Sequence, residues 1–361
     1  MSIPRSLSPD PASPTSGIQE ALDTLGQEGG IVHLLPGEYP VQTSVLLPNG
    51  RTLRGSGSAT IIRLAAGAGR SGQETHVLRN QDPTTGRGLI VENLCVDGHH
   101  SGQAWEKTDL GGAGIVFDGA DGVTVRNVEV RNTWRHGIWF LNGTGARIEN
   151  CEVHTVGCSN ISLGGQHHFR RFTEDVLIRG CRLSDSQKAI GRRAGNCGIE
   201  IKDHTRRVQV ADCQSFHHRE GYGFAVLVHA GKHPAQEVSD ILLANCLAWG
   251  CIHGFAIGTT GDFPVRDVTL SGCHAFENTK SGVCIHAANG GKTSGIGVHG
   301  GIFHDNSEHG ITMEGEGFSG IVLTANRISR NGLTGLAGPC NDQTVTLGAN
   351  ALWDNTKTDP S

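Results

Sequence analysis

The segment Gly254-Phe255-Ala256-Ile257 carries the pattern that decides the fold, because a glycine followed by alternating apolar residues recurs along most of the chain. Apolar residues at every second position are typical of a β-strand with one buried face. Seven further segments share the pattern, one of them beginning with Asn: Gly114-Ile115-Val116-Phe117, Gly137-Ile138-Trp139-Phe140, Asn160-Ile161-Ser162-Leu163, Gly198-Ile199-Glu200-Ile201, Gly223-Phe224-Ala225-Val226, Gly282-Val283-Cys284-Ile285 and Gly310-Ile311-Thr312-Met313. Unambiguous neighbours are 23 to 31 residues apart. A repeat of this length predicts a solenoid, here an all-β, right-handed parallel β-helix of about ten coils.

A second strand follows in each coil and ends at a residue that tolerates a left-handed backbone. This residue is usually Asn, Gly or Asp, and Cys most often comes next. The segments include Ile148-Glu149-Asn150-Cys151, Ile178-Arg179-Gly180-Cys181, Val210-Ala211-Asp212-Cys213, Leu243-Ala244-Asn245-Cys246 and Leu270-Ser271-Gly272-Cys273. We expect these cysteines to be reduced and buried, and to stack in the core about 4.8 Å apart rather than act in catalysis.

The N-terminal region is expected to supply a cap for the solenoid. Residues 1–16 are rich in Ser and Pro and are interpreted as a flexible segment, which leaves 17–361 as a single β-helix domain. Within 17–25, Ile18, Ala21, Leu22 and Leu25 fall on one helical face, and this pattern predicts a short helix over the open end of the core.

Two motifs resemble those of the pectate-lyase-like superfamily. The stretch from Gly29 to Tyr39 reads GGIVHLLPGEY, and the stretch from Leu47 to Gly57 reads LPNGRTLRGSG. The resemblance implies a right-handed parallel β-helix that acts on or binds carbohydrate. Lyases, hydrolases, epimerases and phage tailspikes share this fold, so the resemblance assigns no single family and no single chemistry.

Composition narrows the partners. A net charge of −5 argues against nucleic acid, which requires a basic surface. No apolar run reaches the roughly 18 residues of a membrane span, and no signal-peptide core is present. The protein is therefore expected to be cytoplasmic as written, or secreted or periplasmic if a signal has been removed. Parallel β-helices often trimerise, and the sequence leaves a homo-oligomer open.

One coil differs from the others at its outward positions. Where most coils carry small or apolar residues, this coil carries Glu200 and Lys202, with His204 after the strand. Tyr222 ends the loop that leads into the next coil, and His229 follows Ala225 and Leu227 at the outward positions of that coil. We expect Glu200 and Lys202 to lie side by side in a shallow, exposed groove.

Further candidates are expected to contact the substrate. Cationic loops flank the Glu200 coil, and Arg side chains can bind carboxylate or sulfate groups of an acidic sugar chain by bidentate hydrogen bonds. The candidate substrate-binding residues are His168, Arg170, Arg192, Arg193, Trp139, His253 and His286. Trp139 is a candidate for stacking on a sugar ring, and Arg192 or Arg193 for holding its carboxylate.

The favoured reaction is lyase or epimerase chemistry on an acidic, uronate-containing poly- or oligosaccharide. In this interpretation Lys202 has a depressed pKa and is the base, and Tyr222, His204 or His229 is the acid. Glu200 either orients Lys202 or binds Ca²⁺. The segment Glu200-Ile201-Lys202 is similar to the Glu/Lys arrangement of chondroitinase-B-like alginate lyases, which also use Ca²⁺.

Two other functions stay open. A glycoside hydrolase or transferase would use carboxylates in the same groove, but the polygalacturonase carboxylate motifs are absent, and an inverting hydrolase needs two such groups roughly 6.5–9.5 Å apart. A non-catalytic, tailspike- or adhesin-like module would bind glycan only. No zinc motif occurs in the sequence.

Overall fold

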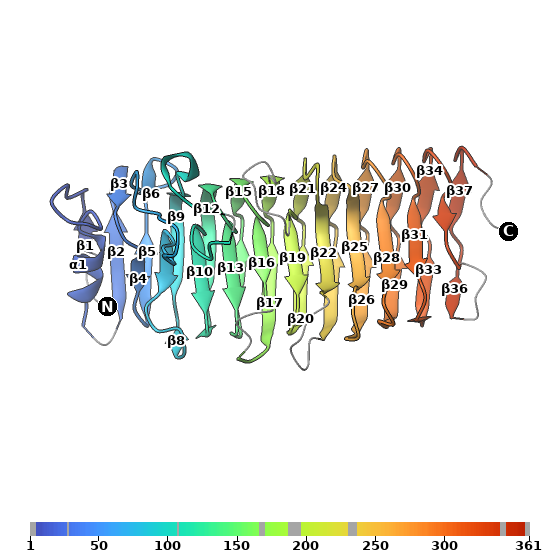
Figure 1. Ribbon diagram of the computed structural model, residues 1–361, viewed down its shortest axis with the longest axis horizontal. Helices are drawn as coiled ribbons and strands as arrows, with labels where there is room; N and C mark the ends of the chain where they lie inside the picture. The colour runs from blue at the N-terminus through green and yellow to red at the C-terminus, as the bar shows by residue number, and fades with distance from the viewer. Residues whose placement is uncertain are drawn as a thin grey trace.

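The structure, a computed structural model, describes residues 5–26, 29–106, 108–165, 170–186, 196–229, 237–339 and 344–357. In this part of the chain almost every regular element is a β-strand, and every strand pairing that joins two coils is parallel. The coils stack into one elongated solenoid, shown in Figure 1. The predicted right-handed parallel β-helix is therefore confirmed. No helix in the described residues is long and apolar enough to cross a lipid bilayer.

The glycine-led segments form one face of the solenoid. In the described residues this face is an 11-stranded sheet in which each strand pairs with its equivalents in the coils before and after it. Its strands are β4 (Val45–Leu47), β7 (Leu78–Asn80), β10 (Ile115–Asp118), β13 (Ile138–Leu141), β16 (Ile161–Leu163), β19 (Ile199–Lys202), β22 (Tyr222–Val228), β25 (His253–Thr259), β28 (Val283–Ala287), β31 (Ile311–Gly315) and β35 (Leu336–Ala337).

The rest of each coil contributes to a second, folded sheet of 24 described strands. Its strands are β1 (Arg5–Leu7), β2 (Gly30–Leu34), β3 (Gly37–Val41), β5 (Arg51–Arg54), β6 (Thr60–Leu64), β9 (Ile90–Asp97), β12 (Thr124–Thr133), β14 (Arg147–Glu149), β15 (Glu152–Val156), β17 (Thr173–Arg179), β18 (Arg182–Ser186), β20 (Thr205–Ala211), β21 (Gln214–Phe216), β23 (Val238–Ala244), β24 (Leu247–Trp249), β26 (Val265–Ser271), β27 (His274–Phe276), β29 (Thr293–His299), β30 (Ile302–His304), β32 (Phe318–Ser319), β33 (Ile321–Thr324), β34 (Arg327–Ser329), β36 (Val345–Leu347) and β37 (Ala351–Trp353). The short strands β8 (Gly86–Arg87) and β11 (Ala120–Asp121) pair separately.

A left-handed corner residue bends the chain within this second sheet. Asn127 (φ 53°) lies inside β12, and Asn150 (φ 53°) and Asp212 (φ 56°) occupy the equivalent place in later coils. Asn and Asp adopt this conformation at lower cost than most residues with a Cβ atom. The turn predicted from the sequence is therefore confirmed.

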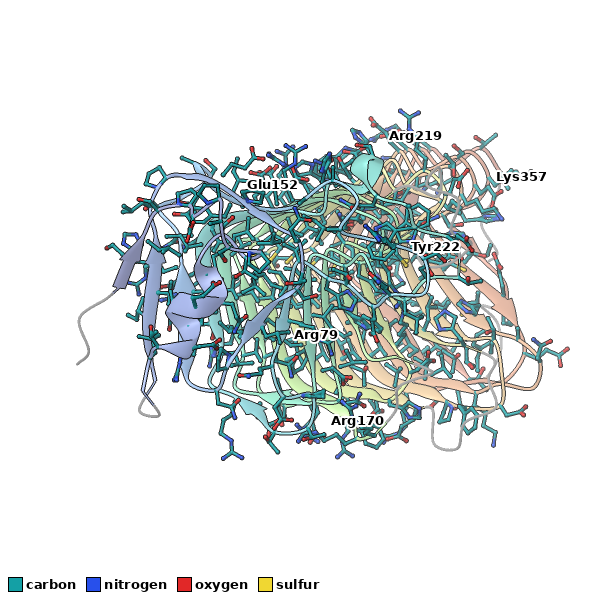
Figure 2. The ribbon with its side chains drawn as sticks, turned by 60° about the vertical axis from the view of Figure 1, so that its left-hand side comes forward. Arg79, Glu152, Arg170, Arg219, Tyr222 and Lys357 are labelled. Atoms are coloured by element: carbon teal, nitrogen blue, oxygen red, sulfur yellow. The ribbon has the colours of Figure 1, made fainter. Side chains whose placement is uncertain are left out.

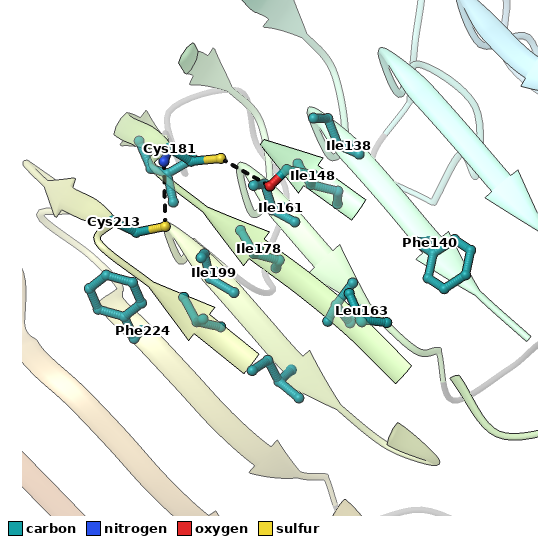
Figure 3. Close-up of a cluster of buried hydrophobic side chains, with 14 of the residues drawn as sticks. Ile138, Phe140, Ile148, Ile161, Leu163, Ile178, Cys181, Ile199, Cys213 and Phe224 are labelled. Carbon is teal, nitrogen blue, oxygen red and sulfur yellow. Dashed lines mark hydrogen bonds between the residues drawn. The ribbon is translucent and has the colours of Figure 1, made fainter. Parts of the chain in front are cut away.

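The cysteines that follow the corner line the core, as predicted. Cys151, Cys181, Cys213, Cys246 and Cys273 are each at most 2 % exposed, and none forms a disulfide. Each thiol donates to the carbonyl oxygen two residues earlier, at Sγ–O distances of 3.2–3.7 Å. Figure 3 shows Cys181 between Ile148 and Cys213, surrounded by inward-facing isoleucines.

A ladder of buried asparagines stabilises the C-terminal coils. Asn306 Oδ1 accepts from Asn278 Nδ2 at 2.8 Å, and Asn306 Nδ2 donates to Asn331 Oδ1 at 3.0 Å. Asn331 Nδ2 in turn donates to Asn355 Oδ1 at 3.0 Å. Because each side chain both donates and accepts, these buried amides are hydrogen-bonded to equivalents in adjacent coils.

The predicted cap is present at the N-terminal end. Helix α1 (Ile18–Asp23) buries Ile18, Ala21 and Leu22 against the first coils, where Figure 1 shows it beside β1 and β2. The prediction that residues 1–16 lie outside the solenoid needs correction, because β1 pairs in parallel with β2. The edge strand of the sheet is therefore supplied by part of the segment interpreted as flexible.

Candidate functional site

The strand register places Glu200 and Lys202 on the outer face of the 11-stranded sheet. Ile199 and Ile201 of β19 point into the core, so the residues that alternate with them point outward. Glu200 is paired with Ser162 of β16 and Ala225 of β22. The predicted direction of these side chains is therefore confirmed.

The prediction that Glu200 and Lys202 lie exposed is wrong. The side chain of Glu200 is 2 % exposed and that of Lys202 is 14 % exposed. Lys202 Nζ donates to Glu200 Oε2 at 2.6 Å, and Ser159 Oγ donates to the same oxygen at 3.0 Å. In the strand register Lys202 lies beside Leu227, which belongs to a small cluster of buried apolar side chains on this face. Alternation in the sequence gives the direction of a side chain but not what covers it.

The ion pair also changes the interpretation of Lys202 as the base. Burial alone would lower the pKa of Lys202, but the charge of Glu200 outweighs burial and raises that pKa above its usual value. Burial alone would raise the pKa of Glu200, and Lys202 and His229 hold it below its usual value. Both groups are therefore charged at neutral pH, and Lys202 has no free electron pair with which to remove a proton.

A second pair of charged groups adjoins the first. Asp203 is 1 % exposed, and its carboxylate accepts from the backbone N–H of His229 at 2.9 Å and contacts ring Nδ1 at 3.2 Å. The other ring nitrogen of His229 lies 4.0 Å from Glu200 Oε1. Burial alone would lower the pKa of His229, but its hydrogen bond to Asp203 and the charge of Glu200 raise that pKa overall. The imidazole is 40 % exposed, and its raised pKa favours the protonated form that a proton donor requires.

An open groove of about 900 Å³ lies on the same face, in the coils that follow. Tyr222, His253 and His286, three of the candidates from the sequence, line this groove. Lys280 and Glu314 also line it, and sequence reasoning did not single them out. The repeat contained a signal for Glu314, because it occupies an outward position directly beside His286 in the strand register.

Several titratable side chains that line the groove are uncharged at neutral pH. Burial, helped by the nearby positive charge of Lys280, lowers the pKa of His253 to about 4. Burial and the charge of His229 lower the pKa of His286 to about 4. Burial raises the pKa of Tyr222 to about 12, with smaller contributions from nearby acidic groups. At neutral pH the groove therefore presents two neutral imidazoles and a protonated phenol.

Gly258 brings the groove and the buried charges together. In the register it lies between Leu227 of β22 and His286 of β28. A Cβ atom on Gly258 would lie 1.9 Å from the carbonyl oxygen of His286 and 2.9 Å from its ring carbon Cγ. The ring of His286 therefore lies close to the bare backbone of Gly258.

Trp139 is not placed to stack on a sugar. Its side chain is 3 % exposed, and its indole N–H donates to the carbonyl oxygen of Gly164 at 3.0 Å. The guanidinium carbon of Arg135 lies 4.2 Å from the centre of the ring. The prediction of an accessible aromatic platform is therefore wrong, because an outward position on this sheet can still be covered.

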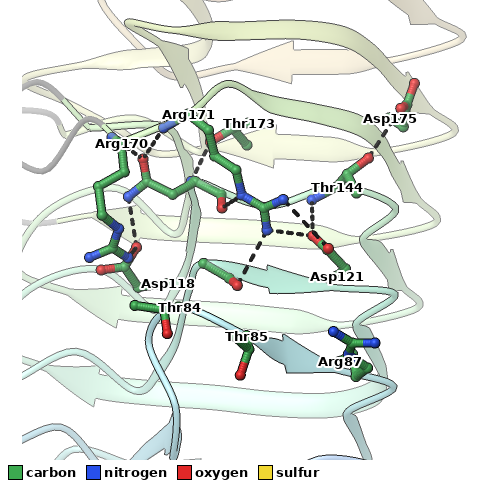
Figure 4. A network of polar contacts seen from close by, with 12 residues as sticks. Thr84, Thr85, Arg87, Asp118, Asp121, Thr144, Arg170, Arg171, Thr173 and Asp175 are labelled. Atoms are coloured by element: carbon green, nitrogen blue, oxygen red, sulfur yellow. Dashed lines mark hydrogen bonds and ion pairs between the residues drawn. The ribbon is translucent and has the colours of Figure 1, made fainter.

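Two other candidates lie away from the groove. Arg170 bonds to Asp118 in the polar network of Figure 4, and Figure 2 shows it well separated from Tyr222. His204 is 2 % exposed and packs edge-on against Phe172, with ring centres 6.2 Å apart, so its burial argues against the predicted role as acid. The remaining candidates lie outside the described residues: His168, Arg192 and Arg193.

Glu200 does not fit the calcium site considered from the sequence. Calcium requires six to eight oxygen ligands, several of them carboxylates. One oxygen of Glu200 already accepts from Lys202, whose positive charge would repel a cation bound there. Among the described residues, no group of three or more His, Cys, Asp and Glu side chains is arranged to hold a metal ion.

The chain is thus a solenoid of stacked coils with parallel strands, and it carries a groove on one outer face. The chain belongs to the family described as right-handed β-helix region, whose model matches residues 113–337, more than half of the sequence. No curated protein sequence matches the chain.

Solved structures share the fold at low sequence identity. The A-module of a mannuronan C-5 epimerase from Azotobacter vinelandii is 18 % identical, with a TM-score of 0.71 over 98 % of this chain and 94 % of that one. A surface adhesin of Streptococcus pneumoniae is 12 % identical, with a TM-score of 0.67 over 98 % and 93 %. The tailspike of E. coli bacteriophage HK620, in complex with a pentasaccharide, is 15 % identical, with a TM-score of 0.67 over 97 % and 64 %. At these identities the likeness shows the fold alone.

Proposed function

We propose that the groove binds an acidic, uronate-containing saccharide and transfers a proton beside its carboxylate, as a lyase or a C5-epimerase does. The observation that carries this proposal is a contrast between two histidines: His286 lines the groove, whereas His229, whose charge lowers the pKa of His286, lies against the buried carboxylates of Asp203 and Glu200. Their pKa values are displaced in opposite directions, upward for His229 and downward to about 4 for His286. Two neighbouring groups with separated pKa values supply an acid and a base at one pH.

In this proposal His286 removes the proton at C5 of the uronate, and the electron pair of the C–H bond moves into the carboxylate. Lys280, an exposed cation on the wall of the groove, stabilises the negative charge that develops there. In a lyase the electrons then form the C4–C5 double bond, and His229 protonates the departing oxygen at C4. In an epimerase a proton instead returns to C5 from the opposite face.

The buried charges give His229 its role. Asp203 fixes the ring through Nδ1, and Glu200 keeps a negative charge near the other ring nitrogen. Lys202 in turn keeps Glu200 ionised. Lys202 therefore acts in this proposal as a positioning residue and not as the base.

The names of solved structures with the same fold support a saccharide ligand. Their names include a mannuronan epimerase and a tailspike bound to a pentasaccharide. A hydrolase is the second candidate, because Glu314 and Glu316 are both exposed and both line the groove. Two carboxylates on one wall are what hydrolysis of a glycosidic bond requires.

Exchange of the C5 hydrogen tests the proposal directly. Polymannuronate, polyguluronate, polygalacturonate and a heparan-type oligosaccharide would be incubated with the protein in deuterated water. Nuclear magnetic resonance would follow deuterium at C5, and near-ultraviolet absorbance would follow unsaturated ends. We expect exchange or elimination on at least one substrate, and a loss of about 100-fold or more in His286→Gln and in His229→Gln.

His274→Gln is the matched control, because His274 lies on β27 of the other sheet, outside the groove. It should keep full activity. New reducing ends without C5 exchange would refute the proposal in favour of the hydrolase, and Glu314→Gln should then abolish them. Glycan binding with no turnover on any substrate would refute it in favour of a binding module.

A further inference from the structure

A second cavity, of about 690 Å³, lies on the outer face of the other sheet. It is lined by a row of side chains from five consecutive coils that are adjacent in the strand register. Along the row the charges alternate in sign: Arg54, Glu92, Arg126, Glu149 and Arg179. The five residues of the row lie on β5, β9, β12, β14 and β17, which are remote in sequence from the strands that line the groove of the proposed function.

One end of the row is rigidly held. Glu92 is 2 % exposed in its side chain, and the Nε atoms of both Arg54 and Arg126 contact its carboxylate. Burial would raise the pKa of Glu92, but the two guanidinium groups lower it overall, so it is ionised. Each arginine contacts Glu92 through Nε and also lines the cavity, so its terminal nitrogens remain available to a ligand. Arg126 is 48 % exposed and can donate from there.

The other end of the row offers acceptors. Arg126 bonds to Glu92 and Arg179 bonds to Asp212 at 3.1 Å, although Glu149 is the register neighbour of both arginines. Among the described residues no cation lies within ion-pair distance of the Glu149 carboxylate. The amide of Asn150, next in sequence, also lines the cavity.

The charges in and beside this cavity balance. Three guanidinium groups and the carboxylates of Glu92 and Glu149 line the cavity, and Asp212, outside the lining, pairs with Arg179. An anion would gain attraction from the arginines but would be repelled by Glu149. A neutral ligand rich in hydroxyl groups would satisfy both ends, because hydroxyls accept from guanidinium and donate to carboxylate.

We propose that this cavity is a second saccharide-binding site, in which a neutral, hydroxyl-rich sugar unit lies over Arg126 and Glu149 and bonds to both. Its volume falls in the range of roughly 300–1,000 Å³ that is typical of small-ligand sites. The site is independent of the proposed catalytic groove, and neither proposal requires the other. A protein with both sites would grip a mixed or branched glycan on two faces of the solenoid.

The test uses the full chain and a panel of neutral probes: maltohexaose, cellohexaose and mannohexaose. Calorimetry or ligand-observed nuclear magnetic resonance would measure binding to the wild type, Glu149→Gln, Arg126→Gln and Arg147→Gln. Glu149→Gln removes no observed ion pair and should leave the fold intact. Arg147 lies on β14, two residues from Glu149 and outside the cavity, so its variant is the control.

We expect one probe to bind the wild type and the control equally, and to bind Glu149→Gln and Arg126→Gln at least about tenfold more weakly. Binding should survive in His286→Gln, which separates this site from the groove. It should also be unchanged when ionic strength rises from about 0.05 to about 0.5 M, which would screen an anion. Absence of binding by all three probes, full binding by Glu149→Gln, or binding that salt abolishes would each overturn the proposal.

Discussion

Removal of the ammonium group of Lys202 should destabilise the protein far more than removal of an exposed lysine. Lys202→Met would leave Glu200, 2 % exposed, without the cation that lies 2.6 Å from its carboxylate. Breaking a buried ion pair by removing one partner costs about 3–5 kcal/mol. Two serine hydroxyls still donate to the carboxylate, so we expect a value near the lower end, about 3 kcal/mol.

Urea denaturation, followed by circular dichroism and by tryptophan fluorescence, would measure this loss where the two transitions coincide. Lys280→Met is the control, because Lys280 is exposed, and its cost should stay within about 0.5 kcal/mol. The double variant Glu200→Gln/Lys202→Met should recover much of the stability, since it leaves no unpaired buried charge. A cost of under about 1 kcal/mol for Lys202→Met, as for a surface pair, would refute the reasoning.

Three further outcomes are expected. The pKa of His229 is raised above its unfolded value of 6.5, so the stability that His229 contributes is complete below pH 6.5 and is lost as the pH rises through the folded pKa. A nuclear magnetic resonance titration should show the raised pKa, and Asp203→Asn should lower it. Gly258→Ala would place Cβ 1.9 Å from a backbone oxygen and should lower both the midpoint of thermal unfolding and the activity of the groove. Gly26→Ala is the control, because a Cβ atom there meets nothing within 4 Å, and it should change neither quantity. Equal unfolding midpoints for the two variants would contradict this prediction. Asn306→Ala would leave amide partners unpaired in the buried ladder and should cost about 1–3 kcal/mol in urea denaturation, a prediction that an unchanged midpoint would exclude.

The architecture could be predicted from the sequence because the signal repeats. Each glycine-led strand, each left-handed corner and each inward cysteine recurs in several coils, so that an ambiguity in one coil is resolved by the next. Asn150 and Cys151 illustrate this, since the same pair of positions is a corner and a core residue throughout. The boundary at residue 16 could not be predicted correctly, because β1 is a single short strand with no repeat to identify it.

The candidate site could be predicted only in part, because a repeat pattern gives direction and not cover. Glu200 and Trp139 point outward as expected, yet both are buried by neighbours that a strand pattern does not place above them. The expectation of a depressed pKa for Lys202 is wrong for a related reason. The carboxylate of Glu200 lies beside Lys202 and raises its pKa. His286 alternates with the buried Val283 and Ile285, so its outward direction follows from the strand pattern, and it lines the groove.

The parallel register has a consequence for any linear ligand. Equivalent side chains of successive coils stand one strand spacing apart, about 4.8 Å, whatever the length of the loops between them. A polymer that runs along the solenoid axis therefore meets the same row of the wall at a constant step, while one that crosses the strands meets different rows of a single coil. Insertions in the loops can change the residues at the edge of the groove without changing the spacing between coils. The length of a bound ligand and its chemistry can therefore change independently on this fold.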